Sequence, residues 1–398
     1  MSPNPIFASG LSTQLVTADA VEEAVAALKR GLDGRTPDLL CFFVTLHHGP
    51  ELEGLSRRIR QATGAAHAVG CTGETVVGGR REIEEGPALS LWAAACEEMT
   101  LRPFRARARA DGDGAIEFDA LPPVEAPERA LLLLLGEPFT FPMADYLAIL
   151  NERLPGVPAV GGMASGGQGP GQSFLFLDEQ LVEDGALGVV IEGGIELFPV
   201  VSQGCRPIGA PLVITSVKDH LVRRLGGREA SRALVDILRA APAEERELFQ
   251  RGPFLGVAVD ARKSRFERGD FLVRAILGVQ SSDGAVAVSD TSLRAGQTVQ
   301  FMVRDAASAG EDLAQLVRAG VGGPTAAPGS VGALLFSCNG RGSRMFPDEP
   351  DHDIRRVQAG FEREIPAAGF FAMGEIGPVG GRNFLHGFTA SVAVFRGR

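Results

Sequence analysis

The sequence has few cysteines, and it contains no long apolar run. Its five cysteines are an odd number in 398 residues, and none of them stands in a CxxC or other metal-type spacing. The five are Cys41, Cys71, Cys96, Cys205 and Cys338. This usage is typical of reduced thiols in a cytoplasmic protein. The longest apolar run, Ala130–Leu135, is far too short to cross a bilayer, and no secretion signal opens the chain. We therefore expect a cytoplasmic protein without membrane insertion.

Positive charge is also scarce. The formal net charge is −10 and the pI is near 5.3, whereas proteins that bind nucleic acid or anionic membranes carry a basic surface. Four arginines lie close together in the sequence, but a solvated loop and helix face is the simpler interpretation. They are Arg341, Arg344, Arg355 and Arg356. We therefore expect no nucleic-acid partner.

Ordinary contents of apolar (45%) and charged (22%) residues predict a soluble globular protein with a sizeable core. The length predicts about two domains. Short apolar runs recur, and each ends on glycine and polar residues, as in VGCTGE, VGGMASGG and AMGEIG. We interpret the chain as three copies of a strand-helix-strand unit followed by a glycine turn and a further strand. This pattern predicts an α/β fold with mixed β-sheets, because the crossover gives parallel neighbours and the short link adds an antiparallel strand.

The densest group of polar residues lies in the last third of the chain. Val331–Phe336 is followed by SCNGRG, Ala367–Met373 by GEIGP, and a glycine turn leads through RNFLH into Phe388–Phe395. Polar side chains after successive strands reach one edge of a sheet, where α/β proteins place their sites. This stretch is the first place to look for a function.

These motifs carry a family resemblance. The segments FSCNGRG, PDHD, GFFAMGEIGPVGGRNFLHGFTAS and GQTVQFMVRDA resemble the C-terminal part of the FIST family, and AVGCTGE resembles its N-terminal part. The resemblance implies a FIST N-like domain over residues 1–195 and a FIST C-like domain over residues 196–398. It further implies a bacterial sensory protein of intracellular signal transduction that binds amino acids or related small polar molecules. No output segment is recognisable in the sequence, so a separate signalling protein is the expected partner.

Six residues are the candidates for a ligand site in the C-terminal part. They are Cys338, Asn339, Arg341, Glu375, Asn383 and His386. The Arg341 guanidinium suits a carboxylate, and Glu375 suits an ammonium, so the pair fits a free amino acid. The alternative interpretation is that Arg341 and Glu375 form a structural ion pair. A related second site is expected at Cys71, Thr72 and Glu74, since Glu74 aligns with Glu375 and the middle copy offers Ser165 nearby.

Two other functions stay open. Cys338 is a candidate nucleophile of a hydrolase or acyl transferase, with His386 as its base and Glu375 orienting the histidine. An adaptor or scaffold, which acts through its surface, is the third possibility. We expect no cofactor and no metal. The acidic segment PDEPDHD, with Asp351, His352 and Asp353, is interpreted as helix caps and a solvated loop. The glycine-rich residues 161–171 lack a phosphate-binding motif and suit a mobile loop at the mouth of a pocket.

Overall fold

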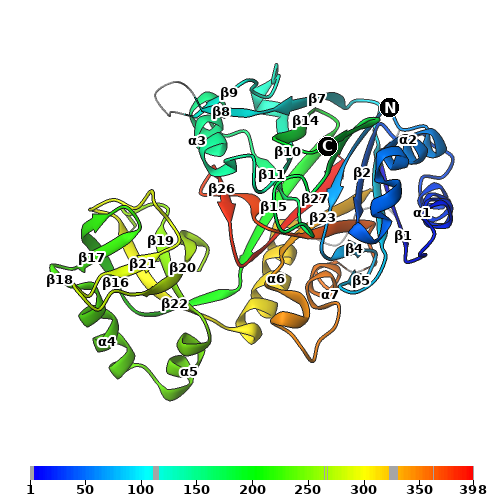
Figure 1. The fold of residues 1–398 in the computed structure, drawn as a ribbon. Helices are drawn as coiled ribbons and strands as arrows, with labels where there is room; N and C mark the ends of the chain where they lie inside the picture. Colours follow the sequence, from blue (N-terminus) through cyan, green and yellow to red (C-terminus); the bar gives the residue numbers. More distant parts are fainter. Residues whose placement is uncertain are drawn as a thin grey trace. The chain divides into compact units, whose positions relative to one another are not determined.

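The computed structural model describes residues 4–110, 116–263, 265, 266, 268–321, 330–361 and 363–397 (Figure 1). They form two compact units. The larger unit contains Met1–Val201, Leu313–Leu385 and Thr389–Arg398, and the smaller unit contains Ser202–Asp312 and His386–Phe388. The expected boundary near residue 195 lies in β15 (Ile195–Gln203), through which the chain leaves the larger unit. As a boundary between two successive domains it stays a prediction.

Three six-stranded sheets make up the larger unit, and each mixes parallel and antiparallel pairs. Sheet 1 has the order β1-β6-β2-β3-β12-β13, sheet 2 the order β26-β25-β11-β10-β14-β7, and sheet 3 the order β15-β27-β23-β24-β4-β5. The predicted α/β class with mixed sheets is therefore confirmed. The bounds in sheet 1 are β1 (Ile6–Ser12), β2 (Leu39–Val44), β3 (His67–Thr72), β6 (Leu89–Ala95), β12 (Leu175–Leu177) and β13 (Gln180–Val182). Those in sheet 2 are β7 (Thr100–Ala106), β10 (Ala130–Gly136), β11 (Ala159–Met163), β14 (Ala186–Glu192), β25 (Glu375–Val379) and β26 (Arg382–His386). Those in sheet 3, besides β15, are β4 (Val76–Gly78), β5 (Arg81–Ile83), β23 (Val331–Cys338), β24 (Ala367–Ala372) and β27 (Thr389–Gly397).

Each sheet is built around one parallel pair whose strands are joined by a helix. The pairs are β2 with β3, β10 with β11, and β23 with β24, and they are connected by α2 (Leu52–Thr63), α3 (Met143–Arg153) and α7 (His352–Gln358). In each sheet an antiparallel strand, β6, β14 or β27, lies on the other side of the first strand. Helix α1 (Thr17–Gly31) follows β1, and α6 (Ala306–Val321) runs from the smaller unit into the larger one.

The two strands that follow each parallel pair join a different sheet. The hairpin β4–β5 follows the parallel pair of sheet 1 in the sequence, but it pairs with β24 of sheet 3. The hairpin β12–β13 follows the parallel pair of sheet 2, but it pairs with β3 of sheet 1. In the same way, β25 follows the parallel pair of sheet 3 in the sequence and pairs with β11 of sheet 2. The three sheets thus share their strands in a cycle. The origin of the three units by repetition of one sequence remains a prediction.

The principal core lies among the inner faces of the three sheets, because alternate side chains of each central strand point there. Phe43 of β2 packs against Phe336 of β23 and Phe370 of β24, with ring centroids 6.3 and 5.1 Å apart. Leu133 of β10 belongs to the same buried cluster. The opposite faces of the strands pack in separate clusters with the helices, as Phe42 of β2 does with residues of α1 and α2.

Among the described residues, the smaller unit is a strongly curved antiparallel sheet with helices packed against it. Its order is β16-β22-β19-β20-β21-β17-β18, and β16 also pairs with β17, so that the sheet closes on itself. The strands are β16 (Cys205–Lys218), β17 (Leu221–Leu225), β18 (Arg228–Glu229), β19 (Pro253–Ala258), β20 (Phe271–Val279), β21 (Val286–Val288) and β22 (Thr298–Arg304). Helices α4 (Ala230–Ala240) and α5 (Ala243–Arg251) bury Leu234 and Phe249 in its core. A further ribbon, β8 (Ala108–Ala110) with β9 (Ile116–Phe118), belongs to the larger unit.

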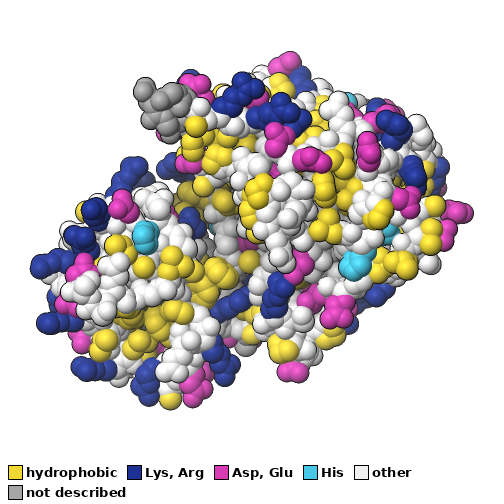
Figure 2. All heavy atoms as spheres, viewed as in Figure 1, with side chains coloured by type: hydrophobic (Ala, Val, Ile, Leu, Met, Phe, Trp, Pro, Cys, Tyr) yellow, Lys and Arg dark blue, Asp and Glu magenta, His cyan; other side chains and the backbone are white. Residues whose placement is uncertain are grey.

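Charged side chains of both signs are interspersed on the face shown in Figure 2. The four arginines that the sequence brings together do not form a basic patch of their own. Arg341 is buried, while Arg344, Arg355 and Arg356 pair with Glu74, Asp351 and Glu349. Within the described residues, no helix is both long and apolar enough to cross a membrane.

Candidate functional site

The turn after β23 directs Arg341 into the protein. The amide of Arg341 donates to the carbonyl of Cys338 over 2.8 Å, and Gly342 follows with a φ of 57°, a left-handed conformation that glycine adopts at little cost. The Arg341 side chain is fully buried, and its guanidinium lies 5.3 Å from the ring centroid of Phe346. The expectation that this arginine lies in a solvated loop is therefore wrong.

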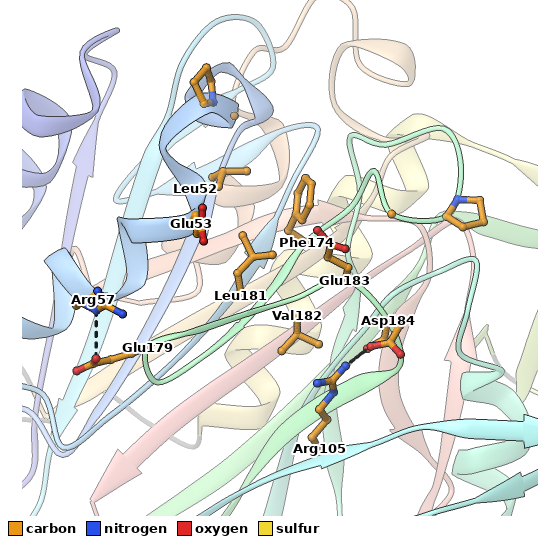
Figure 3. Close-up of a pocket in the computed structure, with 14 residues that line it drawn as sticks. Leu52, Glu53, Arg57, Arg105, Phe174, Glu179, Leu181, Val182, Glu183 and Asp184 are labelled. Carbon is orange, nitrogen blue, oxygen red and sulfur yellow. Dashed lines mark hydrogen bonds and ion pairs between the residues drawn. The ribbon is translucent and has the colours of Figure 1, made fainter.

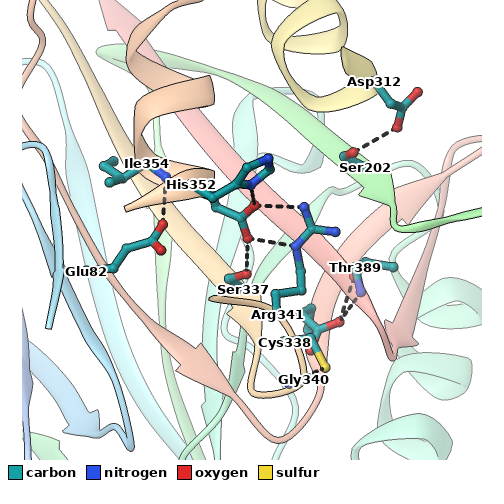
Figure 4. Close-up of polar contacts among 12 residues, drawn as sticks. Glu82, Ser202, Asp312, Ser337, Cys338, Gly340, Arg341, His352, Ile354 and Thr389 are labelled. Carbon is teal, nitrogen blue, oxygen red and sulfur yellow. Dashed lines mark hydrogen bonds and ion pairs between the residues drawn. The ribbon is translucent and has the colours of Figure 1, made fainter. Parts of the chain in front are cut away.

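Arg341, which is labelled in Figure 4 beside Ser337 and His352, is held by Asp353 of α7. Its Nε and Nη2 donate to the two carboxylate oxygens over 2.7 Å each, and the hydroxyl of Ser337 donates to the same carboxylate over 2.5 Å. His352 Nδ1 lies 2.8 Å from Asp353 Oδ1. Burial by itself raises the pKa of Asp353, but the charge and hydrogen bonds of Arg341 outweigh it, and the net pKa lies well below the usual range. His352 and Asp353 are thus buried, and the interpretation of this segment as a solvated loop is wrong for both.

Glu375 is the third fully buried ionisable residue of this polar cluster, after Arg341 and Asp353. It stands at the start of β25, where its Oε2 accepts hydrogen bonds from the amide and the hydroxyl of Thr389 over 3.0 and 2.7 Å. Burial raises the pKa of Glu375 to about 8, against the opposing effects of Thr389, the Cys338 thiol and the Arg341 guanidinium. Glu375 and Arg341 therefore lie near each other, but the carboxylate that binds Arg341 directly is Asp353.

Three buried polar atoms of this cluster have no hydrogen-bond partner of ordinary geometry among the described residues. They are Nη1 of Arg341, Oε1 of Glu375 and Oδ1 of Asn339. Asn339 follows Cys338 at the end of β23, and its backbone carbonyl accepts a hydrogen bond from Arg344 over 2.7 Å. A buried polar atom without a partner costs about 1–3 kcal/mol. The cluster thus offers one donor and two acceptors to a further polar group.

Comparison with known proteins identifies the family. The family model of the FIST N domain matches residues 38–228, and that of the FIST C domain matches residues 230–378. The chain belongs to the FIST family. It is 38% identical over 393 residues to an uncharacterized protein of Mycobacterium tuberculosis (strain ATCC 25618 / H37Rv), Rv0628c, covering 97% of this chain and 98% of that protein. It is also 38% identical over 391 residues to the uncharacterized protein Mb0898c of Mycobacterium bovis, covering 97% of each.

Among solved structures, the chain is similar to a cyanuric acid hydrolase from A. caulinodans. The match covers 99% of both chains, with a TM-score of 0.30 and a sequence identity of 11%. FIST domains themselves are generally described as sensory domains for small ligands in signal transduction.

Of the six residues expected in the FIST C site, the structure brings together Cys338, Asn339, Arg341 and Glu375. Asn383 has other partners: its Nδ2 donates to Val157 over 2.9 Å, and its Oδ1 accepts from Ala159 over 2.8 Å. Its side chain therefore ties β26 to the strand β11. His386, at the end of β26, is buried and belongs to the smaller unit, whereas Cys338 belongs to the larger one. The pairing of Cys338 with His386 stays a hypothesis.

The three residues of the expected FIST N site are either buried or bound to other residues of the protein. Cys71 and Thr72 end β3 and are fully buried, and the Thr72 hydroxyl accepts a hydrogen bond from the amide of Phe174 over 3.0 Å. Glu74 is exposed, and its side chain pairs with Arg344 over 2.5 Å. The Glu74 amide donates to the Ser165 hydroxyl over 2.8 Å, so the turns after β3 and β11 meet, a contact that the alignment of the copies did not predict. A ligand at this second site remains a prediction.

Sequence reasoning missed Thr389 and Glu82. Glu82 of β5 is buried and accepts a hydrogen bond from the amide of Ile354 over 2.7 Å. Burial, followed by the nearby charge of Asp353, raises the pKa of Glu82 well above its usual range. The hairpin that carries Glu82 is far from α7 in the sequence, so no local pattern reveals the contact. Thr389 directly follows Phe388, where the last apolar run begins. The sequence could have indicated Thr389 only if the start of this run had been predicted to lie beside the GEIG turn that carries Glu375.

A cavity of about 1030 Å³ lies elsewhere in the larger unit (Figure 3). Pro170 and Gly171 of the glycine-rich segment line it, together with residues of α2 and of the β12–β13 hairpin, but none of the expected site residues does so. Its two arginines are paired, Arg57 with Glu179 and Arg105 with Asp184. Within the described part of the chain, no three His, Cys, Asp or Glu side chains are arranged to hold a metal ion.

Proposed function

We propose that this FIST protein is a cytoplasmic sensor that binds an amino acid or a related small polar molecule in a strand-end pocket beside Arg341 and Glu375. The observation that carries the proposal is the pair of fully buried ionisable side chains, Arg341 and Glu375, each with one atom that lacks a partner. Buried polar groups are nearly always hydrogen-bonded, and a ligand is one way in which such atoms are satisfied. The family supports the broader statement, a small-ligand sensor.

The two free atoms suit the two ends of an amino acid. Nη1 of Arg341 donates to the ligand carboxylate, and Oε1 of Glu375 accepts from its ammonium group. Nη1 is the guanidinium nitrogen without a partner, because Asp353 binds Nε and one N–H of Nη2. The ligand carboxylate therefore binds at Nη1, and Asn339 Oδ1 provides a further acceptor.

Proton release accompanies this mode of binding. Without ligand the pKa of Glu375 is about 8, so the carboxyl group is mostly protonated at neutral pH. An ammonium group beside it favours the ionised form and lowers that pKa. We expect affinity for zwitterions to rise from pH 6 to pH 8, because less work is needed to ionise Glu375. The signal is passed to a separate output protein.

The first test is a thermal-shift and calorimetric screen of the full chain with amino acids and small carboxylic acids at pH 7 and pH 8. A ligand that binds the folded state raises the melting temperature by mass action. Glu375→Gln should weaken binding of a zwitterion about tenfold or more and remove the proton release. Arg341→Ala is a poor test, because it leaves Asp353 buried without its partner.

Glu137→Gln is the matched control. Glu137 is also a fully buried glutamate after a strand with one unpartnered oxygen, but its hydrogen bonds go to Phe139 and Thr140 of its own loop. This variant should bind the ligand with unchanged affinity. Equal weakening by both substitutions, or a panel without any saturable binding, contradicts the proposal.

A further inference from the structure

The strand β13 forms an edge of sheet 1 among the described residues. The strand order of the sheet ends with β12-β13, and β13 pairs with β12 alone. Leu177 and Gln180 face each other across a two-residue turn, and residues that flank such a turn exchange two hydrogen bonds. Because hydrogen-bonded and non-bonded pairs alternate along an antiparallel ladder, the amide and carbonyl of Leu181 point away from β12. β13 therefore offers backbone groups with which a further strand can pair.

This edge strand lines the cavity of about 1030 Å³, together with residues of α2 (Figure 3). The apolar side chains of the cavity are buried or half-buried, whereas two of its acidic side chains are exposed. An apolar floor therefore lies beneath an acidic rim. We call this cavity the α2–β13 groove, and its floor and rim include Leu52, Phe174, Leu181, Val182, Glu53 and Glu183.

Two carboxylates at the rim lack a counter-ion. Both arginines of the groove pair with acidic neighbours. Glu53 of α2 and Glu183, which follows β13, have no hydrogen-bond or ion-pair partner among the described residues. Figure 3 shows these two side chains on either side of Leu181. The groove thus has two uncompensated negative charges beside an apolar side chain.

The charge of the whole larger unit has the same sign. The smaller unit, Ser202–Asp312 with His386–Phe388, contains 16 of the 39 Lys and Arg and 14 of the 49 Asp and Glu. The larger unit therefore holds the other 23 basic and 35 acidic residues, a formal net charge of −12. Such a field attracts basic partners and repels acidic ones.

We propose that the α2–β13 groove binds an extended basic segment of a partner protein, which adds to sheet 1 as a strand beside β13. Glu179, Leu181 and Glu183 share one face of the chain here, because alternate residues of a strand do so. Leu181 packs in the cluster that contains residues of α2, so this face is the one on which Glu53 lies. A segment with an apolar side chain between two cationic ones, at alternate positions, matches this face. Its backbone pairs with the edge, and its side chains give the specificity.

The same charges disfavour a second copy of this chain as the occupant. If two β13 strands paired antiparallel about Leu181, Glu179 of one copy would lie opposite Glu183 of the other. Like charges directly opposite each other on neighbouring strands are destabilising, whereas opposite charges are stabilising. The groove is therefore suited to a basic strand. This inference adds an interaction surface to the molecule and does not depend on the amino-acid ligand.

The test titrates the full chain into a fluorescein-labelled peptide, Thr-Arg-Thr-Leu-Thr-Arg-Thr, and follows its anisotropy at low ionic strength. We expect saturable binding that weakens as salt is added. The double variant Glu53→Gln/Glu183→Gln should weaken binding about fivefold, the effect of losing two cross-strand charge pairs. Glu22→Gln/Glu152→Gln is the matched control, because it neutralises two exposed glutamates of α1 and α3 that do not line the groove. It should leave the affinity unchanged.

Two further probes separate strand addition from simple charge attraction. The same peptide with every backbone nitrogen methylated keeps its charges but cannot donate backbone hydrogen bonds, so it should bind at least about tenfold more weakly. Hydrogen exchange in β13, measured by mass spectrometry, should slow when the unmodified peptide is bound. The inference is overturned if the peptide does not bind saturably or if the two double variants bind it alike. It is also overturned if the methylated peptide or spermine binds as tightly as the unmodified peptide. Failure of amino-acid binding with this pattern intact would contradict the proposed ligand alone.

Discussion

Arg341 is a fully buried arginine whose guanidinium makes two hydrogen bonds with one carboxylate, that of Asp353. Removing one partner of such a pair leaves the other charge buried without compensation, which costs about 3–5 kcal/mol. We therefore expect Arg341→Ala to lower the free energy of unfolding by about this amount in urea denaturation. Arg355→Ala, which breaks an exposed pair with Asp351, should change it by less than about 1 kcal/mol. Equal effects of the two substitutions would show that the buried pair is not held as described.

Glu375 makes stability depend on pH in a defined window. Its pKa rises from 4.5, the ordinary value, to about 8 in the folded protein, so between these values the folded state holds a proton that the unfolded state has lost. The contribution of Glu375 to stability is therefore largest below about pH 4.5, and it is lost as the pH rises through 8. From pH 5 to pH 8 the loss is roughly 4 kcal/mol. Glu375→Gln should reduce that slope in a series of urea titrations and leave the part that arises from the raised pKa of Glu82.

Asp353 acts in the opposite direction, which separates the two contributions. Its folded-state pKa lies below the ordinary value of 3.8, so the stability that it contributes is present above about pH 4 and is lost in more acid solution. A slope between pH 5 and pH 8 that is as steep in Glu375→Gln as in the unmodified protein would show that Glu375 does not cause it.

The sequence allowed the residues of the cluster to be named but not their partners. The sequence alone shows that polar residues flanked by glycine follow the apolar runs of two predicted strands. These residues are Cys338, Asn339, Arg341 and Glu375. The choice between Glu375 and Asp353 as the partner of Arg341 is not visible, because it depends on where α7 packs. Asn383 was predicted as a ligand group for its amide, but the amide satisfies the backbone of a strand that lies far away in the sequence.

At the scale of the element, glycine sets how closely neighbouring strands approach. Gly70, Gly161 and Gly369 occupy the second strand of the three parallel pairs, and in each case a Cβ would lie within 2.3 Å of a carbonyl oxygen of the first strand. Gly161 and Gly369 have φ values of 144° and 155°, which other residues rarely adopt. The alternation of apolar runs and glycine turns predicted these strands, whereas the exchange of hairpins between sheets has no local signal.

Gly161→Ala is the sharpest test of this arrangement. The added Cβ would lie 1.8 Å from the carbonyl oxygen of Leu134, and the φ of 144° is strained for alanine. We expect a loss of about 3 kcal/mol or more, measured as a lower melting temperature. Gly156→Ala is the control, since Gly156 also has a positive φ, 82°, but nothing lies within 4 Å of its Cβ position. A loss no larger than that of the control would mean that the strands can move apart without cost.

At the scale of the molecule, the cyclic exchange of strands joins the three sheets of the larger unit. Each sheet is completed by strands that follow the parallel pair of another, and the inner faces contribute to one buried cluster. A sheet that opens must therefore release strands of its neighbours and expose the shared core. Regions connected in this way tend to unfold as one cooperative unit.

This connection predicts the result of hydrogen exchange on Leu133→Ala. Leu133 is buried in the shared core, and its truncation should cost about 2–5 kcal/mol. Amide protection measured by mass spectrometry should fall by a similar free energy in β2, β10 and β23, although only β10 carries the substitution. Val299→Ala, a buried position in the core of the smaller unit, is the comparison, and its effect should appear in β16, β19 and β22. Loss of protection confined to the strands of sheet 2 in Leu133→Ala would contradict the coupling, because each sheet would then open without the others.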